Sequence, residues 1–124
     1  MFTVRTRVAP SAIHGIGVFA DEPIAAGQEV WRYEPAFDRT ISDEELARAP
    51  DGFRHLLQTY AYRSVDLGGA LLLPCDHARF LNHSDAPNTA EERFRSVATR
   101  PIAAGEEITC DYGVFCAGWT GFEG

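Results

Sequence analysis

An eight-residue segment occurs twice in this chain. Pro-Ile-Ala-Ala-Gly-Gln-Glu-Val at 23–30 returns as Pro-Ile-Ala-Ala-Gly-Glu-Glu-Ile at 101–108, with six of the eight positions identical. Proline fixes one backbone angle, glycine permits a positive one, and the apolar residue three positions after the glycine can begin a strand. Each copy therefore predicts a tight turn followed by a short β-strand. Two copies indicate related hairpin-like units packed in one domain, because a solenoid needs about three repeats or more.

Short apolar and β-branched runs, bounded by Gly, Pro, Asp and Asn, make up most of the remaining chain. Such runs are typical of short strands. Strands are predicted at 2–8, 17–20, 29–33, 60–64, 70–73, 93–99 and 107–110. Ser42 and Glu45 form a capping-box pattern that predicts a helix start, and apolar residues between 53 and 60 recur at helical spacing and predict a second short helix. The sequence thus predicts a β-rich α+β fold with few short helices.

Length and charge limit the class of protein. At 124 residues the chain is expected to form a single domain over 1–124. It has no apolar run near the roughly 18 residues that cross a bilayer and no secretory pattern at its start, so a cytoplasmic protein without a membrane partner is expected. Asp and Glu outnumber Lys and Arg by 18 to 11, a net charge of −7. This balance disfavours direct binding to nucleic acid and favours a Lys/Arg-rich partner, although it also serves simple solubility.

The cysteine and histidine pattern predicts neither a disulfide framework nor a metal site. Cys75, Cys110 and Cys116 are odd in number and widely spaced, and no Cys-x-x-Cys occurs. His77 and His83 lie near Cys75, but their spacing matches no common zinc site. No metal is expected.

Gly15 to Ala20 forms a G-x-G-x-x-A string. A dinucleotide-binding fingerprint would need a helix directly after it. Pro23 and the turn residues Ala26 and Gly27 follow instead and leave no room for that helix. Two interpretations remain: a glycine turn between strands, or a place where the backbone approaches a ligand closely.

Two further segments are dense in polar side chains or end in a tyrosine. Residues 79–88 read Arg-Phe-Leu-Asn-His-Ser-Asp-Ala-Pro-Asn, which suits a polar turn or a ligand site. A Ser–His hydrolase is disfavoured because no Gly-x-Ser-x-Gly frames Ser84. Residues 105–113 read Gly-Glu-Glu-Ile-Thr-Cys-Asp-Tyr-Gly, which predicts a strand ending at Tyr112. A tyrosine there can serve packing or present its phenol.

Taken in order, the G-x-G string, the glycine turn before Tyr33, the 79–88 segment and the 105–113 segment resemble the SET-domain family from about Ala12 to Tyr112. The resemblance implies the SET (β-clip) fold, made of short curved sheets. It also implies a pseudoknot, in which the C-terminal segment passes beneath an earlier loop and brings the Asn-His-Ser and Asp-Tyr segments together. This would be an exception to the usual absence of threaded loops. Residues 113–124 would then form a short aromatic tail.

The resemblance also implies a function: a protein-lysine N-methyltransferase that takes its methyl group from S-adenosylmethionine and acts on a basic protein. Tyr112 and Tyr33 match the active-site tyrosines of the family. The residues expected to contact the donor are His14, Ile16, Gly17, Arg79, Phe80, Asn82, His83 and Trp119. In size the chain is similar to stand-alone bacterial or viral members, some of which complete their sites by forming a homodimer.

The chain departs from the family pattern in two places. Asp85 stands where many members have Cys, and only Cys116 follows Tyr112 where zinc-binding tails carry three cysteines. Trp119 or Phe122 is expected to cover the adenine of the donor, or alternatively to pack on the core. A non-catalytic SET-like module that binds donor or protein is the main competing hypothesis, and a purely structural dimerisation domain is a third.

Overall fold

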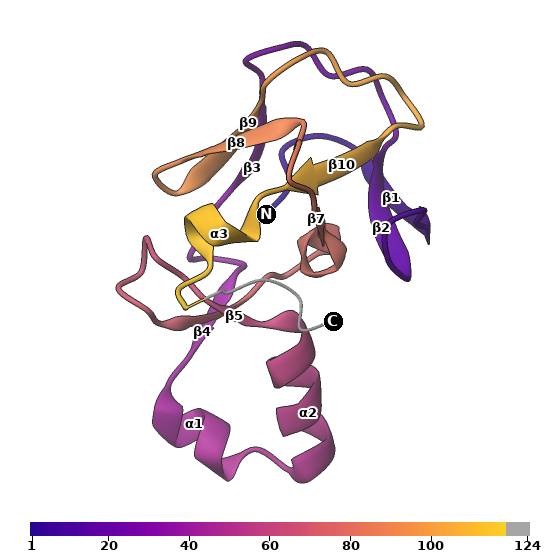
Figure 1. The fold of residues 1–124 in the computed structure, drawn as a ribbon. Coiled ribbons are helices and arrows are strands. Elements are labelled where there is room, and N and C mark those ends of the chain that lie inside the picture. The colour runs from indigo at the N-terminus through magenta and orange to yellow at the C-terminus, as the bar shows by residue number, and fades with distance from the viewer. Residues whose placement is uncertain (119–124) are drawn as a thin grey trace.

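The computed structural model describes residues 1–118, which fold into small sheets with a few short helices (Figure 1). One sheet has the strand order β1-β2-β10-β7, a second β3-β9-β8, and a third β4-β6-β5. The strands are β1 Thr6–Pro10, β2 Ile16–Ala20, β3 Glu29–Arg32, β4 Arg39–Ile41, β5 Tyr62–Arg63, β6 Leu71–Leu73, β7 Asn82–His83, β8 Thr89–Glu92, β9 Arg95–Ala98 and β10 Glu107–Cys110. The predicted β-rich α+β class is confirmed.

The repeat builds the centre of the fold. Gly27 and Gly105 have φ angles of 81° and 88°, the left-handed conformation that the turn requires, and β3 and β10 begin two residues after them. The two copies pair with each other, because Ile24 and Ile102 form an antiparallel bridge in which each N–H donates to the other's carbonyl at 2.9 Å. Both isoleucines are almost fully buried. The prediction of two packed turn–strand units is confirmed.

Two apolar clusters lie in the interior. The larger cluster is built from Val4, Val18, Ala20, Ile24, Val30, Ala98, Ile102 and Ile108, and the smaller from Ile41, Leu57 and Leu71. The larger joins the sheets that contain the two repeat copies. The smaller lies where β4 and β6 meet α2 (Asp51–Tyr60). This helix and α1 (Asp43–Arg48) form a projection at one end of the molecule (Figure 1). Burial of these side chains is the main force that holds the short strands together.

A local sequence signal accounts for the start of α1. Ser42 Oγ accepts a hydrogen bond from the Glu45 N–H at 3.0 Å, and Glu45 Oε1 accepts one from the Ser42 N–H at 3.1 Å. The predicted capping box is therefore present. No helix within residues 1–118 is both long and apolar enough to cross a membrane.

The position of β10 decides how the site is assembled. It pairs antiparallel with β2, with Ile108 opposite Val18, and parallel with β7, with Thr109 opposite Asn82 and Cys110 opposite His83. A C-terminal strand is thus inserted between two earlier segments, as the pseudoknot requires. Consequently the Asn-His segment and the residues leading to Tyr112 lie side by side.

Several predicted elements differ in extent or kind. The strand predicted at 2–8 is β1 at Thr6–Pro10, and Phe2 forms only a bridge to Trp31. The strands β4, β7 and β8 and the 3₁₀ helix η1 (His77–Phe80) were not predicted. Tyr112 does not end a strand but opens the short helix α3 (Tyr112–Phe115). The cause is local: Asp111 caps that turn, its Oδ1 accepting a hydrogen bond from the Gly113 N–H at 2.8 Å.

Candidate active site

Asn82 links three segments of the predicted site. Its side chain is buried on β7, and Nδ2 lies 3.0 Å from the His14 carbonyl oxygen, 3.2 Å from that of Ile16 and 3.0 Å from Glu107 Oε2. These three acceptors share the two hydrogens of one amide. Asn82 therefore fixes the loop before β2 against β7 and β10.

Glu107 completes this network from β10. Its two carboxylate oxygens accept hydrogen bonds from Ser11 Oγ at 2.8 and 3.0 Å. A Cβ placed on Gly17 would lie 2.3 Å from Glu107 Oε2 and 3.1 Å from Asn82 Nδ2. Glycine at position 17 is thus required by the close approach of a carboxylate to the backbone, a reason that the G-x-G pattern alone does not reveal.

A Gly17→Ala substitution is expected to lower the free energy of unfolding by about 1–3 kcal/mol, because Glu107 must move and lose its bonds to Ser11 and Asn82. Urea denaturation measures the change. Gly52→Ala in α2 is the control, because its added Cβ would meet no described atom within 4 Å and alanine favours helix. Equal stability of the two variants would contradict the role given to Gly17.

His83 and Tyr112 are held against each other. The Tyr112 N–H donates to His83 Nδ1 at 3.1 Å, so that nitrogen is the acceptor and Nε2 carries the hydrogen that it donates to Asp85 Oδ1 at 2.9 Å. The two rings are 5.4 Å apart between centroids. Because His83 is buried and accepts the Tyr112 N–H, it fixes the position of the first residue of α3. Its partner Asp85 is the residue that stands where many family members have Cys.

The Tyr112 hydroxyl points back to β7 and donates a hydrogen bond to the Leu81 carbonyl oxygen. Burial raises the pKa of the Tyr112 phenol above its usual value, and the nearby thiols of Cys110 and Cys116 add to the effect. The phenol therefore stays protonated at neutral pH. It can donate a hydrogen bond and orient a ligand, but it cannot act as a resting base.

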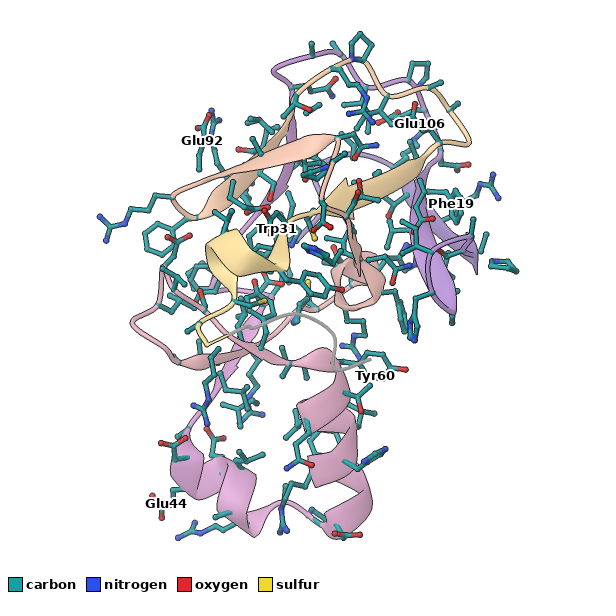
Figure 2. All side chains as sticks on the ribbon, in the orientation of Figure 1. Phe19, Trp31, Glu44, Tyr60, Glu92 and Glu106 are labelled. Atoms are coloured by element: carbon teal, nitrogen blue, oxygen red, sulfur yellow. The ribbon has the colours of Figure 1, made fainter. Side chains whose placement is uncertain are left out.

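A cavity of about 380 Å³ opens beside Tyr112, within the usual size range of small-ligand pockets. Its lining includes Trp31, Thr59, Tyr60, Ala61, Tyr62, Arg63, Pro74, Ala78, Arg79, Leu81, Glu91, Ser96, Cys110, Tyr112, Phe115, Cys116, Ala117 and Gly118. Figure 2 shows two of these, Trp31 in the interior near α3 and Tyr60 at the end of α2 that faces the sheets. Most of the lining is aromatic, aliphatic or sulfur-bearing, which suits a ligand with a long apolar stem.

The predicted donor residues divide between the cavity and the Asn82 network. Arg79 lines the cavity and donates to the Pro74 carbonyl oxygen at 2.9 Å, and Phe80 packs edge-on against the cavity residue Tyr60 at 5.3 Å. His14, Ile16, Gly17 and Asn82 form the network described above. Trp119 and Phe122 lie outside the described residues.

Tyr33 lies away from the larger cavity. It stacks on Phe94 with ring centroids 6.1 Å apart and lines a smaller space of about 10 Å³. Tyr62 lines both spaces, and burial raises the pKa of its phenol. The catalytic role of Tyr33 stays a prediction. Tyr62, like Tyr112, lines the larger cavity.

Sequence reasoning also missed Asn88 and Glu91. Asn88, the last residue of the 79–88 segment, is fully buried and clamps β10: its Oδ1 accepts from the Thr109 N–H at 2.9 Å, and its Nδ2 donates to the Glu107 carbonyl at 2.8 Å. Glu91 lies on β8, where adjacent residues face opposite sides, so one residue of the pair Glu91 and Glu92 must point inward. A strand prediction at 89–92 would have identified one of these two glutamates as a residue that faces the interior.

Replacing Glu91 by Gln is expected to raise the free energy of unfolding above pH 7 by about 1–3 kcal/mol. Burial raises the pKa of Glu91 from 4.5 to about 7. Between these two values the unfolded chain loses the proton that the folded protein keeps, so the wild type loses stability as pH rises and the Gln variant does not. Urea denaturation across this range, with Glu92→Gln at the exposed neighbour as control, measures the difference. A gain that is the same at every pH would contradict the assignment.

Comparison with known proteins finds similarity to enzymes of one family. It is 30% identical to Drosophila melanogaster histone-lysine N-methyltransferase SETD1 over 86% of this chain and 7% of that protein, and 32% identical to human histone-lysine N-methyltransferase 2B over 82% and 4%. The chain thus spans less than a tenth of the length of these relatives. It also superposes on Chaetomium thermophilum Polycomb Repressive Complex 2 in an autoinhibited conformation bound to S-adenosylmethionine, with a TM-score of 0.66 at 23% identity over 92% of this chain and 16% of that one.

The SET-domain profile matches residues 15–113, from the G-x-G string to the residue after Tyr112. The match therefore contains Asn82 and its partners Ile16 and Glu107, the His83–Tyr112 pair and most of the cavity lining, while His14 and Ser11 of the Asn82 network lie just before it. This chain belongs to the SET-domain family.

Proposed function

We propose that this chain transfers the methyl group of S-adenosylmethionine to the side-chain amine of a lysine in a basic protein. The observation that carries the proposal is the position of Tyr112, which lines a largely apolar cavity while its backbone is bound to His83, next to Asn82 on β7. Relatives named as histone-lysine N-methyltransferases support the reaction.

The residues present fit the donor. The loop from His14 to Gly17 is proposed to present its backbone to the donor, and Asn82 holds the carbonyl groups of His14 and Ile16 in fixed positions. Arg79, Phe80 and His83, and Trp119 beyond the described residues, are the other groups proposed to hold it. The donor's sulfonium carries the methyl group to be transferred. The Chaetomium thermophilum complex with S-adenosylmethionine bound has the same fold over this region.

The cavity suits a lysine as acceptor. A lysine side chain has a reference pKa of about 10.4, so its ammonium must lose a proton before the nitrogen can attack. Apolar surroundings and a nearby positive charge both lower the pKa of an ammonium. The Tyr112 phenol, kept protonated by burial, contributes by orientation, since an in-line displacement depends on alignment.

The charge of the chain supports a basic substrate. A net charge of −7 attracts Lys/Arg-rich segments at a distance. Histones, ribosomal proteins and histone-like DNA-binding proteins all have the required chemistry. Homodimerisation, a cytoplasmic location and membership of the bacterial or viral type stay predictions.

Calorimetric titration with S-adenosylmethionine, followed by a transfer assay on a panel of basic proteins, tests the proposal. Saturable donor binding with methyllysine formation is expected. Donor binding without transfer to any protein of the panel would favour the non-catalytic SET-like module. Failure of the folded protein to bind donor would contradict both and leave a structural domain.

A further inference from the structure

A half-buried carboxylate shares the cavity with Tyr112. Glu91 on β8 is half-buried and lines both the larger cavity and the smaller space next to it. Both of its carboxylate oxygens lie 2.9 Å from Ser96 Oγ. A serine hydroxyl has one hydrogen to donate, so much of the accepting capacity of this carboxylate is left for a group in the cavity.

An unsatisfied donor marks the same region. Trp31 is nine-tenths buried, lines the same two spaces as Glu91, and its Nε1 has no hydrogen-bond partner within residues 1–118. An indole N–H left without a partner inside a protein costs free energy. The part of the cavity near Trp31 and Glu91 is therefore polar, with a donor in the Trp31 indole and an acceptor in the Glu91 carboxylate.

The charges around Glu91 favour a cation beside its carboxylate. The two arginines of the lining have other partners: Arg63 pairs with Asp43 at 2.9 Å, and Arg79 donates to a backbone carbonyl. Asp66 and Asp111 add negative potential at Glu91. The other titratable groups of the lining are the phenols of Tyr60, Tyr62 and Tyr112 and the thiols of Cys110 and Cys116. Within residues 1–118, Glu91 thus forms no ion pair with a side chain of the lining, and its carboxylate can pair with a cation from a ligand.

We propose that Glu91 pairs with the ammonium of the substrate lysine and accepts its proton, an inference that rests on the proposed function. One N–H bond of the ammonium breaks and one O–H bond forms on a Glu91 oxygen. The lysine nitrogen keeps the electron pair and becomes the neutral nucleophile. The proton passes from Glu91 to solvent water before the next turnover. Tyr112 cannot take this role, because its phenol stays protonated.

The acidity of Glu91 agrees with this role. Burial raises the pKa of Glu91 to about 7, with smaller contributions from Asp66 and Asp111, while the hydrogen bond from Ser96 opposes the increase. A base whose pKa lies near the working pH is the most effective acceptor of a proton, and such groups contribute about 10²–10⁴-fold to rate. An ordinary surface carboxylate would be too weak a base.

The pH dependence of turnover tests the inference in the full-length chain. Wild-type kcat is expected to level off above about pH 7, where Glu91 is ionised. Glu91→Gln keeps an acceptor for Ser96, so it should fold and bind donor normally. Its kcat at neutral pH should fall by about 10²-fold and keep rising into alkaline pH. Glu92→Gln, exposed and paired with Arg95 outside the cavity, is the control and should behave as wild type.

Peptide affinity tests the pairing of Glu91 with the lysine ammonium without any turnover. With S-adenosylhomocysteine present, the wild type should bind a lysine-rich peptide more tightly than its twin with norleucine at the target position, and Glu91→Gln should lose that preference. An unchanged pH profile together with an unchanged preference would overturn the role of Glu91. If the wild type transfers no methyl group to any basic protein, the proposed function is contradicted instead. The peptide comparison would still decide whether Glu91 pairs with the ammonium.

Discussion

An Asn82→Ala variant is expected to lose saturable S-adenosylmethionine binding and about 2–4 kcal/mol of its free energy of unfolding. The side chain donates to the His14 and Ile16 carbonyls and to the Glu107 carboxylate, and its removal leaves all three acceptors without that donor. The loop that precedes β2 then loses its anchor to β7. Calorimetric titration measures donor affinity, and urea denaturation measures stability.

Asn88→Ala supplies the matched control. Asn88 belongs to the same segment and is more deeply buried, but its hydrogen bonds go to β10 and to Glu106. Both variants should be less stable, whereas only Asn82→Ala should lose donor binding under conditions where the protein is folded. Equal donor affinity in folded Asn82→Ala and wild type would contradict the assignment of this loop to the donor.

A Tyr112→Phe variant is expected to lower kcat by about 10²–10³-fold and to change donor affinity by less than about threefold. The substitution removes only the hydroxyl that donates to the Leu81 carbonyl, and the ring can keep its contacts with His83 and Phe115. Loss of that hydroxyl removes the group proposed to orient the lysine amine. The products would also report a change in the number of methyl groups added.

Single-turnover kinetics of Tyr112→Phe with saturating donor separates an effect on the rate of methyl transfer from an effect on donor affinity. A rate of transfer equal to that of the wild type would remove Tyr112 from the reaction. A loss of donor affinity with an unchanged rate would assign the residue to donor binding. Either result would require another group, with Tyr62 the nearest in kind, to orient the lysine.

The sequence was most informative where local chemistry decides structure. Gly27 and Gly105 need positive φ angles, and the repeat revealed both turns and the strands after them. Ser42 and Glu45 form the expected capping box. By contrast, β7 has two residues and exists because Asn82 and His83 pair with β10, and such a long-range pairing leaves no local signal.

The candidate site was also predictable only in part. The resemblance named Asn82, His83 and Tyr112 as site residues, and the insertion of β10 beside β7 brings them together. It could not reveal Glu91, because a Glu-Glu pair resembles a solvated surface until the strand around it is known. Tyr33 lies beside Phe94 because its N–H donates to the Phe94 carbonyl at 2.8 Å, a contact between distant segments.

Methyl transfer to lysine at the Tyr112 cavity can be observed directly. The most direct measurement is mass spectrometry of core histones after incubation with the protein and a donor that carries a deuterated methyl group. Deuterated methyl groups are expected on lysine side chains with the wild type, and little or none with Tyr112→Phe at the same donor occupancy. Full donor binding by the wild type with no labelled lysine, in histones or in other basic proteins, would contradict it and identify a SET-domain module that binds without catalysis.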